Sequence, residues 1–349
     1  MSQTPKQSAE RSVPTSADVA RLAGVSRATV SYVLNNTASV RISEPTRRRV
    51  REAAEELGYV PHAAARSLRA GHTRMVLLPT ASFPTGPRYE QFLAELQWAL
   101  RRLDYTVVQY GGLGLDGDEA ARAWAELRPV AVVSLGDAGL TPHGVDVLKR
   151  SGAKAVITLG SRRVAGAHCL VMDQTEVGVR AVAHLVERGR RAIGVVMPQE
   201  PGLGPSAELR MEGARRAAAT AGARIEPLPL SYAEEPAAEL AGRWRGLGLD
   251  AVFTYNDDYA VLLMRALKDE GIAIPTQTAV IGADDLLLGR LQRPRLSTVH
   301  IDLVTGRRLA ELVDRVVRAP HDVADLAEVA DVTETYDLMG VRAVHRESS

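Results

Sequence analysis

The chain is poor in cysteine and in large aromatic side chains: it has one cysteine, Cys169, three phenylalanines and three tryptophans. A single cysteine excludes a disulfide framework within the chain and a cysteine-rich zinc site. No apolar run reaches the roughly 18 residues of a membrane span. The polar segment 1–13 lacks the apolar centre of a secretory signal. These absences predict a cytoplasmic protein with no membrane partner.

The net charge of the chain is small, but the charged residues are unevenly distributed along it. The 349 residues carry a formal net charge of +1, and 46% of them are hydrophobic, so we expect a globular protein of more than one domain. Residues 1–74 hold 12 Lys and Arg against 6 Asp and Glu, whereas the remainder is mildly acidic. A basic end on an acidic body predicts a polyanion-binding module attached to a second function.

Residues 15–60 predict a helix-turn-helix domain that follows a disordered tail over residues 1–14. Thr15 can cap a first helix, and Gly24 separates it from a second helix that begins after Ser26 and ends near residue 35. A third amphipathic helix has enough apolar positions to pack on both. In such a motif the second helix enters the major groove of DNA.

The rest of the chain predicts an α/β core. Residues 61–72 predict one more short helix, begun by a proline and ended by a glycine. From residue 73 onward, apolar runs alternate with amphipathic stretches, which predicts mostly parallel sheets covered on both faces and divided into two lobes. The predicted strands are Met75–Leu78, Tyr105–Tyr110, Val130–Leu135, Ala153–Leu159, Ala192–Met197, Ala251–Tyr255 and Thr278–Gly282.

Two long strings carry a family resemblance. TSADVARLAGVSRATVSYVLNN and ISEPTRRRVREAAEELGYVPHAAARSLRAG, within residues 15–72, resemble the DNA-binding head and hinge helix of the lactose-repressor (LacI/GalR) family. The resemblance implies a transcriptional regulator, expected to be a repressor, that binds a palindromic DNA operator as a homodimer. It implies no enzymatic activity, no cofactor and no metal. A three-helix bundle used for protein contacts remains the alternative for this segment.

Looser matches extend into the body, residues 73–349. VMDQTEVG near residue 171, ELRMEGARRAA near 208 and AVFTYNDDYA near 251 resemble the periplasmic-binding-protein-like core of the same family. The resemblance implies a small-molecule effector, a sugar or another metabolite, bound between two lobes. The implied lobes comprise about residues 73–172 with 303–322, and about 173–298 with 323–349.

The same resemblance assigns DNA contacts by position. Arg27, Ala28 and Tyr32 would read base edges, through guanine acceptors, a thymine methyl group and one donated hydrogen bond. Leu68 matches the leucine that wedges between base pairs from the minor groove. The other expected contacts, to phosphates or beside the wedge, are Ser26, Thr29, Ser31, Asn35, Arg66 and Arg69.

The effector site is also assigned by resemblance. Arg210 begins an R-x-x-G element completed by Gly213, and it would anchor a ligand hydroxyl or carboxylate. Asp284 would accept protons from ligand hydroxyl or amine groups. The other expected effector-binding residues are Tyr89, Tyr232 and Asn256. The structural alternative is that Arg210 and Asp284 pair as a salt bridge, and the low aromatic content predicts a thin stacking surface for a sugar.

Two short motifs suggest other chemistry. Gly112–Gly117 match G-x-G-x-x-G after a strand, and Asp137 lies 20 residues beyond the last glycine, as in a dinucleotide-binding fingerprint. They support the alternative of a nucleotide-dependent enzyme with an appended DNA-binding head. The motif follows the second strand of the body rather than the first, which favours a simple glycine-rich loop. His184 and Glu187 form the metal-binding pattern H-x-x-E, but no third metal ligand accompanies them. A polar face of a helix gives the same pattern.

Overall fold

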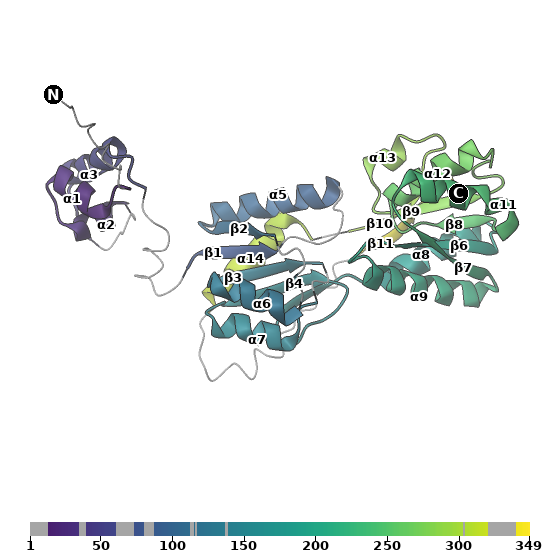
Figure 1. The fold of residues 1–349 in the computed structure, drawn as a ribbon, viewed down its shortest axis with the longest axis horizontal. Helices are drawn as coiled ribbons and strands as arrows, with labels where there is room; N and C mark the ends of the chain where they lie inside the picture. Colours follow the sequence, from purple (N-terminus) through teal and green to yellow (C-terminus); the bar gives the residue numbers. More distant parts are fainter. Residues whose placement is uncertain are drawn as a thin grey trace, which may run out of the picture. The chain divides into compact units, whose positions relative to one another are not determined.

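The computed structural model divides the chain into two compact units, Met1–Thr73 and Arg74–Ser349 (Figure 1). The expected tail up to residue 12 and the expected hinge helix at 61–72 lie outside the described residues. No helix in the described part of the chain is long and apolar enough to cross a membrane. The described residues are 13–34, 40–60, 73–79, 87–111, 115, 117–136, 139–302, 304–319 and 340–349.

The described part of the first unit folds into three helices, α1 (Ser16–Ala23), α2 (Arg27–Leu34) and α3 (Glu44–Glu56). All three contribute small apolar side chains to one core, as their periodicity predicts. A core of this size suits a domain of about fifty residues. The buried residues are Val19, Ala20, Ala23, Val30, Val33, Val50, Ala53 and Ala54.

Local hydrogen bonds set the boundaries of these helices. The backbone N–H and the hydroxyl of Thr15 both donate to Asp18 Oδ2, at 2.9 and 2.6 Å. Gly24 ends α1 with φ at +64°, a conformation that costs glycine little. The Ser26 hydroxyl accepts the Thr29 N–H at 3.1 Å and so begins α2. The expected caps are therefore confirmed.

In the second unit, the first sheet is parallel throughout, in the order β2-β1-β3-β4-β5. Helices α5 and α14 cover one face of this sheet, and α6 and α7 cover the other (Figure 1). Its strands are β1 (Met75–Pro79), β2 (Thr106–Tyr110), β3 (Ala131–Leu135), β4 (Ala155–Gly160) and β5 (His168–Val171). Its helices are α5 (Pro87–Arg102), α6 (Gly117–Glu126), α7 (Pro142–Arg150) and α14 (Gly306–Arg318).

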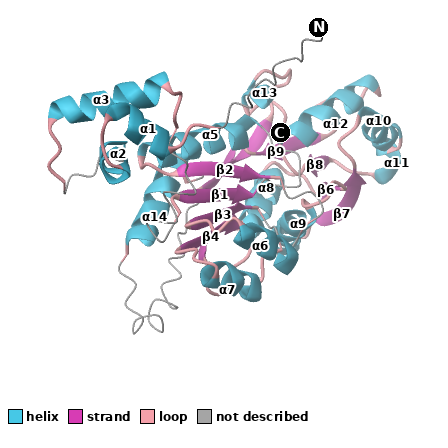
Figure 2. Cartoon of the chain, turned by 60° about the vertical axis from the view of Figure 1, so that its left-hand side comes forward, coloured by secondary structure: helices cyan, strands magenta, loops and turns pink. Residues whose placement is uncertain are grey.

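The second sheet runs β11-β10-β9-β8-β6-β7, and only β11 is antiparallel to its neighbour among these strands. Helices α8 and α9 pack on one face, and α10, α11 and α12 on the other (Figure 2). The strands are β6 (Ala192–Pro198), β7 (Arg224–Leu230), β8 (Ala251–Phe253), β9 (Ala279–Ala283), β10 (Ser297–Ile301) and β11 (Val341–Val344). The helices are α8 (Gln174–Glu187), α9 (Gly204–Ala221), α10 (Glu234–Gly242), α11 (Trp244–Leu247), α12 (Asp257–Asp269) and the short α13 (Leu287–Arg290).

The chain passes from the layers of one sheet to those of the other. It leaves the first sheet after β5 and enters α8, then returns after β10 to α14, which packs on α5. It enters the second sheet again at Gly340, just before β11. Parallel neighbouring strands need a crossover connection, usually a helix that packs on their own sheet. The chain between β10 and β11 passes through α14, which packs on the other sheet, so β11 can pair antiparallel to β10.

Candidate nucleic-acid interface and ligand site

Helix α2 presents the residues expected to read bases on its exposed side. Arg27 and Ala28 are exposed in its first turn, and the Tyr32 side chain is 39% exposed one turn later. Val30 and Val33 lie on the opposite side and are buried in the core. Among the described residues, no ion pair involves Arg27. Its guanidinium therefore needs no internal partner broken before it contacts an external acceptor.

The residues with hydroxyl groups on or beside the same helix differ in their exposure. Ser26 Oγ lies 2.9 Å from Thr29 Oγ1; Ser26 directly precedes α2, and Thr29 is in its first turn. Ser26 is exposed, whereas Thr29 and Ser31 are half-buried. The N-terminal end of a helix favours a phosphate, because its backbone N–H groups are unpaired there. Asn35, Arg66, Leu68 and Arg69, which complete the expected set, lie outside the described residues.

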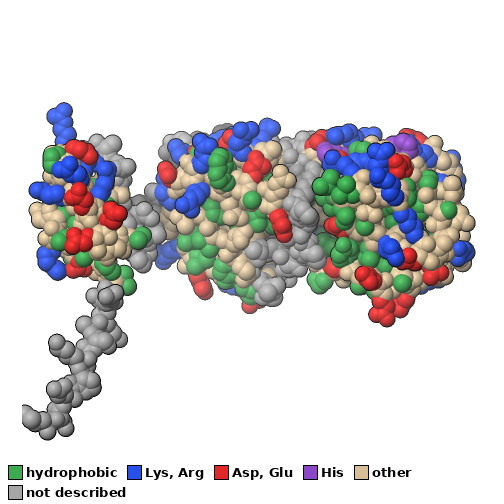
Figure 3. Space-filling model, turned by 90° about the horizontal axis from the view of Figure 1, so that it is seen from above, with side chains coloured by type: hydrophobic (Ala, Val, Ile, Leu, Met, Phe, Trp, Pro, Cys, Tyr) green, Lys and Arg blue, Asp and Glu red, His purple; other side chains and the backbone are tan. Residues whose placement is uncertain are grey.

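Much of the remaining positive charge of the first unit is balanced locally. Arg21 lies 3.0 Å from Asp18, and α3 carries the wider pairs Arg48–Glu52 at 3.8 Å and Arg51–Glu44 at 3.9 Å. Blue and red side chains accordingly alternate on the face of this unit drawn in Figure 3. Exposed pairs of this kind are worth little. Breaking these exposed ion pairs costs little free energy, so the arginines can still contact phosphates.

A second group of polar residues gathers where the parallel strands of the second sheet end. Arg210 on α9 is 6% exposed. Its Nε donates to Gln174 Oε1 at 2.7 Å, its Nη1 donates to the Tyr255 carbonyl oxygen, and its guanidinium carbon lies 4.5 Å from the centroid of the Tyr255 ring. Arg210 is therefore fixed by Gln174 and Tyr255, and its Nη2 group is not used in these two bonds.

The glycine of the R-x-x-G element has a packing role. A Cβ added at Gly213 would overlap the backbone carbonyl of Thr175 on α8, and one added at Gly178 would overlap the carbonyl of Arg210. These two glycines allow the backbones of α8 and α9 to touch. The close approach places Gln174, at the start of α8, beside the Arg210 guanidinium.

Three tyrosines form a cluster beside Arg210. The ring centroids of Tyr232 and Tyr259 are 5.2 Å apart, and those of Tyr255 and Tyr259 are 6.1 Å apart in an edge-on arrangement. The Tyr259 hydroxyl donates to Glu200, whose other oxygen accepts the Tyr232 N–H. Burial and the Glu200 hydrogen bond raise the pKa of the Tyr259 hydroxyl, so it remains a donor. Tyr232 is 50% exposed, so the cluster is partly accessible to solvent.

Tertiary packing brings three of the nine tyrosines together here, although the sequence as a whole has few aromatic residues. The thin stacking surface for a sugar stays a prediction. Sequence reasoning selected Tyr232 but missed Tyr255, Tyr259 and Glu200. The signal that could have found them is position: Glu200 and Tyr255 each follow a strand by two residues, at the edge where ligands bind in parallel sheets.

Asn256 and Asp284 stand at the ends of neighbouring strands. Asn256 Oδ1 accepts the Tyr259 N–H at 3.1 Å and caps α12, so its NH₂ group is not part of the cap. Asp284 has φ at +94° and its N–H donates to the Val299 carbonyl at 2.9 Å. Burial, and then the charge of Asp284, raise the pKa of Asp258, the second residue of α12.

Tyr89 differs from the other expected effector residues. It lies on α5, against the core of the first sheet, and burial raises the pKa of its hydroxyl. Arg210, Tyr232, Asn256 and Asp284 instead gather at the second sheet. The described residues thus bring four of the five expected residues to one edge of one sheet.

The dinucleotide-binding alternative is not favoured by the strand order. Gly112, Gly114 and Asp137 lie outside the described residues. The strand before the motif, β2, is at the edge of its sheet, whereas the strand order reverses between β1 and β3. Dinucleotides bind at such a reversal point rather than beside an edge strand.

Comparisons with known proteins agree with this geometry. A model described as "Bacterial regulatory proteins, lacI family" matches residues 15–62, and "Periplasmic binding protein-like domain" matches residues 182–348. The chain is 30% identical over 328 residues to the HTH-type transcriptional regulator GalR of Escherichia coli strain K12, covering 90% of this chain and 91% of that protein. It is 32% identical over 293 residues to the HTH-type transcriptional repressor PurR of Vibrio cholerae, covering 81% and 85%.

Solved structures show the same fold. The lac repressor dimer bound to operator and the anti-inducer ONPF superposes with a TM-score of 0.72 at 22% identity, covering 97% of this chain and 99% of that one. A helix-turn-helix unit joined to a two-sheet binding core defines a DNA-binding transcriptional regulator. The chain belongs to the lacI family of bacterial regulatory proteins.

Proposed function

We propose that the protein is a cytoplasmic repressor that binds a palindromic operator as a homodimer and responds to a small polar ligand. The observation that carries the DNA-binding part is the exposed face of α2. Its Arg27, Ala28 and Tyr32 point away from a core built on Val30 and Val33. Two such helices, related by the two-fold axis of a dimer, match two half-sites of a palindrome.

The chemistry of this face favours direct reading of bases. An arginine at the start of the recognition helix can donate two hydrogen bonds to guanine, a methyl side chain can contact thymine, and a tyrosine hydroxyl can donate one further bond. The hydroxyls of Ser26, Thr29 and Ser31 would orient the helix on the phosphates without reading sequence.

The ligand part of the proposal rests on Arg210, Tyr232, Asn256 and Asp284. They lie at the carboxyl ends of the parallel strands of the second sheet, which we call the ligand edge. Donors are available there from Arg210 Nη2 and the Asn256 amide, and Asp284 supplies an acceptor. The half-exposed ring of Tyr232 offers an apolar face beside them. This combination suits a small molecule with several hydroxyl or amine groups and one flat or apolar side.

Control of DNA binding by such a ligand requires different affinities for two arrangements of the protein. The ligand edge and α14 are linked by the chain itself, because β10 leads directly to the crossing into α14. A ligand that shifts the chain at the edge of the second sheet therefore acts on a segment that also belongs to the other sheet.

The proposal is tested by selection of DNA from a pool of random duplexes with the full-length protein. We expect enrichment of a sequence with two symmetric half-sites, and repression of a reporter promoter that contains it. Operator affinity is then measured with and without fractions of cell-extract metabolites. Failure to enrich any sequence contradicts the DNA-binding part, and indifference to every fraction contradicts the ligand part.

A further inference from the structure

Asp258 is an acidic residue at the ligand edge to which the fold gives no partner. It is the second residue of α12, close behind the end of β8, and it is half-buried. Among the described residues, no hydrogen bond and no ion pair involves its carboxylate. A charge that is partly removed from water costs free energy unless a donor or an opposite charge accompanies it. Contacts within the fold therefore do not explain an acidic residue at this position.

The residue before it, Asp257, holds the first turn of α12 against the loop that follows β9. Asp257 is fully buried, and its Oδ1 accepts the Thr298 hydroxyl at 2.6 Å. Its Oδ2 accepts the Leu286 N–H at 2.7 Å, and a Cβ on Gly282 would overlap the same carboxylate. Because Asp257 contacts the chain on both sides of Asp284, the loop that carries Asp284 packs directly on the start of α12.

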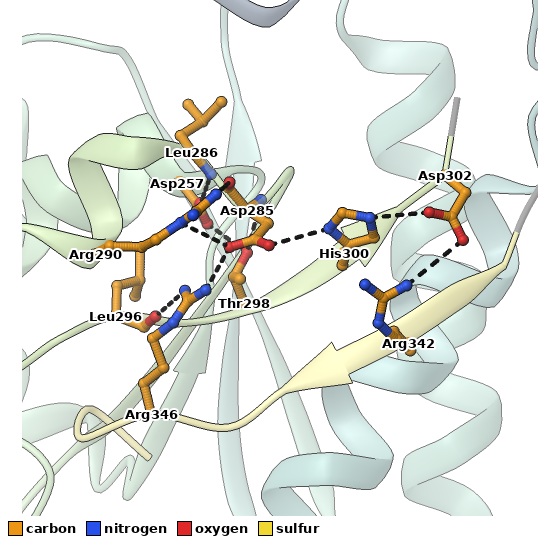
Figure 4. Close-up of polar contacts among 10 residues, drawn as sticks. All are labelled: Asp257, Asp285, Leu286, Arg290, Leu296, Thr298, His300, Asp302, Arg342 and Arg346. Atoms are coloured by element: carbon orange, nitrogen blue, oxygen red, sulfur yellow. Dashed lines mark hydrogen bonds and ion pairs between the residues drawn. The ribbon is translucent and has the colours of Figure 1, made fainter. Parts of the chain in front are cut away.

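The next acidic residue of this loop, Asp285, is surrounded by basic side chains (Figure 4). Arg346 donates to Asp285 Oδ1, and Arg290 Nε lies 3.6 Å from the same oxygen. His300 lies between two carboxylates, with its Nδ1 3.0 Å from Asp285 Oδ2 and its Nε2 3.0 Å from Asp302 Oδ1. Asp285 thus binds the two arginines beside this loop, and its charge is balanced within the fold.

The charge of Asp258 is instead opposed by its surroundings. Burial, and then the charge of Asp284, raise the pKa of Asp258. Burial, and then the charge of Asp258, raise the pKa of the Tyr232 hydroxyl. In the part of the chain that the structure describes, no basic group acts on either pKa. A positive charge beside Asp258 would offset both its burial and its repulsion by Asp284.

The half-exposed Tyr232 offers an aromatic ring to such a charge. Its ring centroid lies 5.2 Å from that of Tyr259, and Glu200 accepts its backbone N–H, so its position is fixed from two sides. Another tyrosine of the cluster already holds a cation, because the Arg210 guanidinium carbon lies 4.5 Å from the centroid of Tyr255. Over the described residues, no arginine or lysine lies on the Tyr232 ring. A cation against an aromatic face is favourable, and more so where water is partly excluded.

Arg210 independently points to a ligand at the same edge. It is 6% exposed, and it donates through Nε to Gln174 and through Nη1 to Tyr255. Its Nη2 group has no hydrogen-bond partner among the described residues. A nearly buried guanidinium with an unused donor needs an acceptor, whereas the carboxylates of Asp258 and Asp284 need donors. Two carboxylates against one guanidinium leave the edge with an excess of negative charge.

We propose that the ligand of this protein is a small organic amine of net positive charge, whose ammonium group lies against the Tyr232 ring and donates to Asp258 and Asp284. Its other end carries a hydroxyl or carbonyl oxygen that accepts a hydrogen bond from Arg210. Amino sugars and amino alcohols have this chemistry, whereas neutral sugars lack the ammonium group. This inference rests on the proposed function, because it names the class of ligand for the same site.

The structural alternative is that Asp258 only stabilises its helix. Acidic side chains in the first turn of a helix interact favourably with the partly positive helix end. Glu234 and Glu235 occupy the first turn of α10 in this way and are exposed. The alternative and the proposal predict opposite effects on stability, because an acidic residue that serves the helix end stabilises the fold, whereas one kept for a cationic ligand destabilises the protein without that ligand.

The first test is thermal unfolding of the full-length protein at neutral pH without ligand. Asp258→Asn removes the charge and keeps the shape, so we expect it to melt about 1–3 °C higher than the wild type. Glu235→Gln is the matched control, and it should melt at the same temperature as the wild type or about 1 °C lower. An Asp258→Asn protein that melts below the wild type would assign Asp258 to the helix end and overturn the proposal.

The second test divides cell-extract metabolites on a cation exchanger at neutral pH into a retained and an unretained fraction. A ligand that binds the folded protein raises its melting temperature. We expect the retained fraction to do so for the wild type and for Glu235→Gln, and not for Asp258→Asn. Defined probes are D-glucosamine with D-glucose and ethanolamine with ethylene glycol. In at least one pair, the amine should bind the wild type about tenfold more tightly than its neutral counterpart, and Asp258→Asn should lose this preference.

The outcomes separate this inference from the proposed function. A melting shift caused by the unretained fraction alone, or an equal shift in the wild type and in Asp258→Asn, would overturn the amine and leave a ligand-responsive repressor standing. A protein whose melting temperature neither fraction changes would contradict the ligand part of the proposed function, and the amine with it. Neither test uses DNA, so failure to find an operator would leave the amine proposal standing.

Discussion

The two candidate sites of this protein are built in opposite ways. The proposed DNA-reading face lies on a single helix, α2, within six consecutive residues, Arg27–Tyr32, and the side chains expected to read bases are exposed. The ligand edge takes residues from α8, α9, α12 and several strand ends, and these residues already bond to one another. A site on one helix can be lost without harm to the fold, whereas a site assembled from many elements is also part of what holds the fold together.

The largest expected effect tests whether the packing of α8 on α9 beside the ligand edge stabilises the fold. Gly213→Ala would place a methyl group on the Thr175 carbonyl, so α8 and α9 must separate. We expect a loss of about 3 kcal/mol in unfolding free energy of the second unit. Gly222→Ala is the control: its φ is +63° and no atom crowds it, so it should cost about 1 kcal/mol. Thermal unfolding that ranks the two variants equally would contradict close packing of α8 on α9.

The next effect separates the two roles of the ligand edge. Arg210→Ala removes the donor from the Gln174 side chain and the Tyr255 carbonyl, so we expect a loss of about 2–3 kcal/mol in stability as well as loss of the ligand response. Asp284→Asn is nearly isosteric and should change stability by less than about 0.5 kcal/mol while also removing the ligand response.

Thermal unfolding and operator affinity, each with and without metabolite fractions, measure both quantities for these two variants. A full ligand response in Asp284→Asn would exclude Asp284 from the site. An Arg210→Ala protein as stable as the wild type would show that the two hydrogen bonds of Arg210 do not contribute to the stability of the fold.

A smaller and more specific effect is expected on α2. Arg27→Ala should cost about 1–3 kcal/mol in operator binding, confined to one base position of each half-site. Ser31→Ala should weaken binding to all duplexes alike, because a phosphate contact carries no base preference. Binding to the selected operator and to its single-base variants distinguishes the two. Uniform loss in both variants would remove the base-reading role of Arg27.

The smallest effect concerns the buried carboxyl at the start of α12. Burial raises the pKa of Asp257 to about 7, so the folded protein binds its proton more tightly than the unfolded chain does. This contribution to stability is present below about pH 4 and is lost as the pH rises to about 7. Asp257→Asn resembles the protonated form, since its NH₂ can donate to Thr298 and its oxygen can accept from Leu286. We expect the variant to match the wild type at pH 4 and to melt about 2–4 °C higher at pH 8. An equal difference at both pH values would contradict the raised pKa.

Much of the fold could be predicted from local pattern. The caps at Thr15 and Ser26 and seven strands, of which only β2 is an edge strand, follow from side-chain type and apolar runs, with ends that move by one or two residues. Four strands were not predicted. Three of these, β5, β7 and β11, are edges of their sheets. Edge strands bury less and tolerate residues that a central strand cannot, such as the two prolines of β7.

The sequence by itself determined the three-helix head, the α/β character of the body and the placement of the proposed DNA-reading residues on a single helix. Each depends on residues within a few positions of one another. Tertiary structure alone decided that Tyr255 and Tyr259 join Tyr232 beside Arg210, and that His300 lies between Asp285 and Asp302. These neighbours come from different strands and helices. Sheet order, register and the paths between sheets bring them together, and none of these is encoded by the local spacing of the residues that meet.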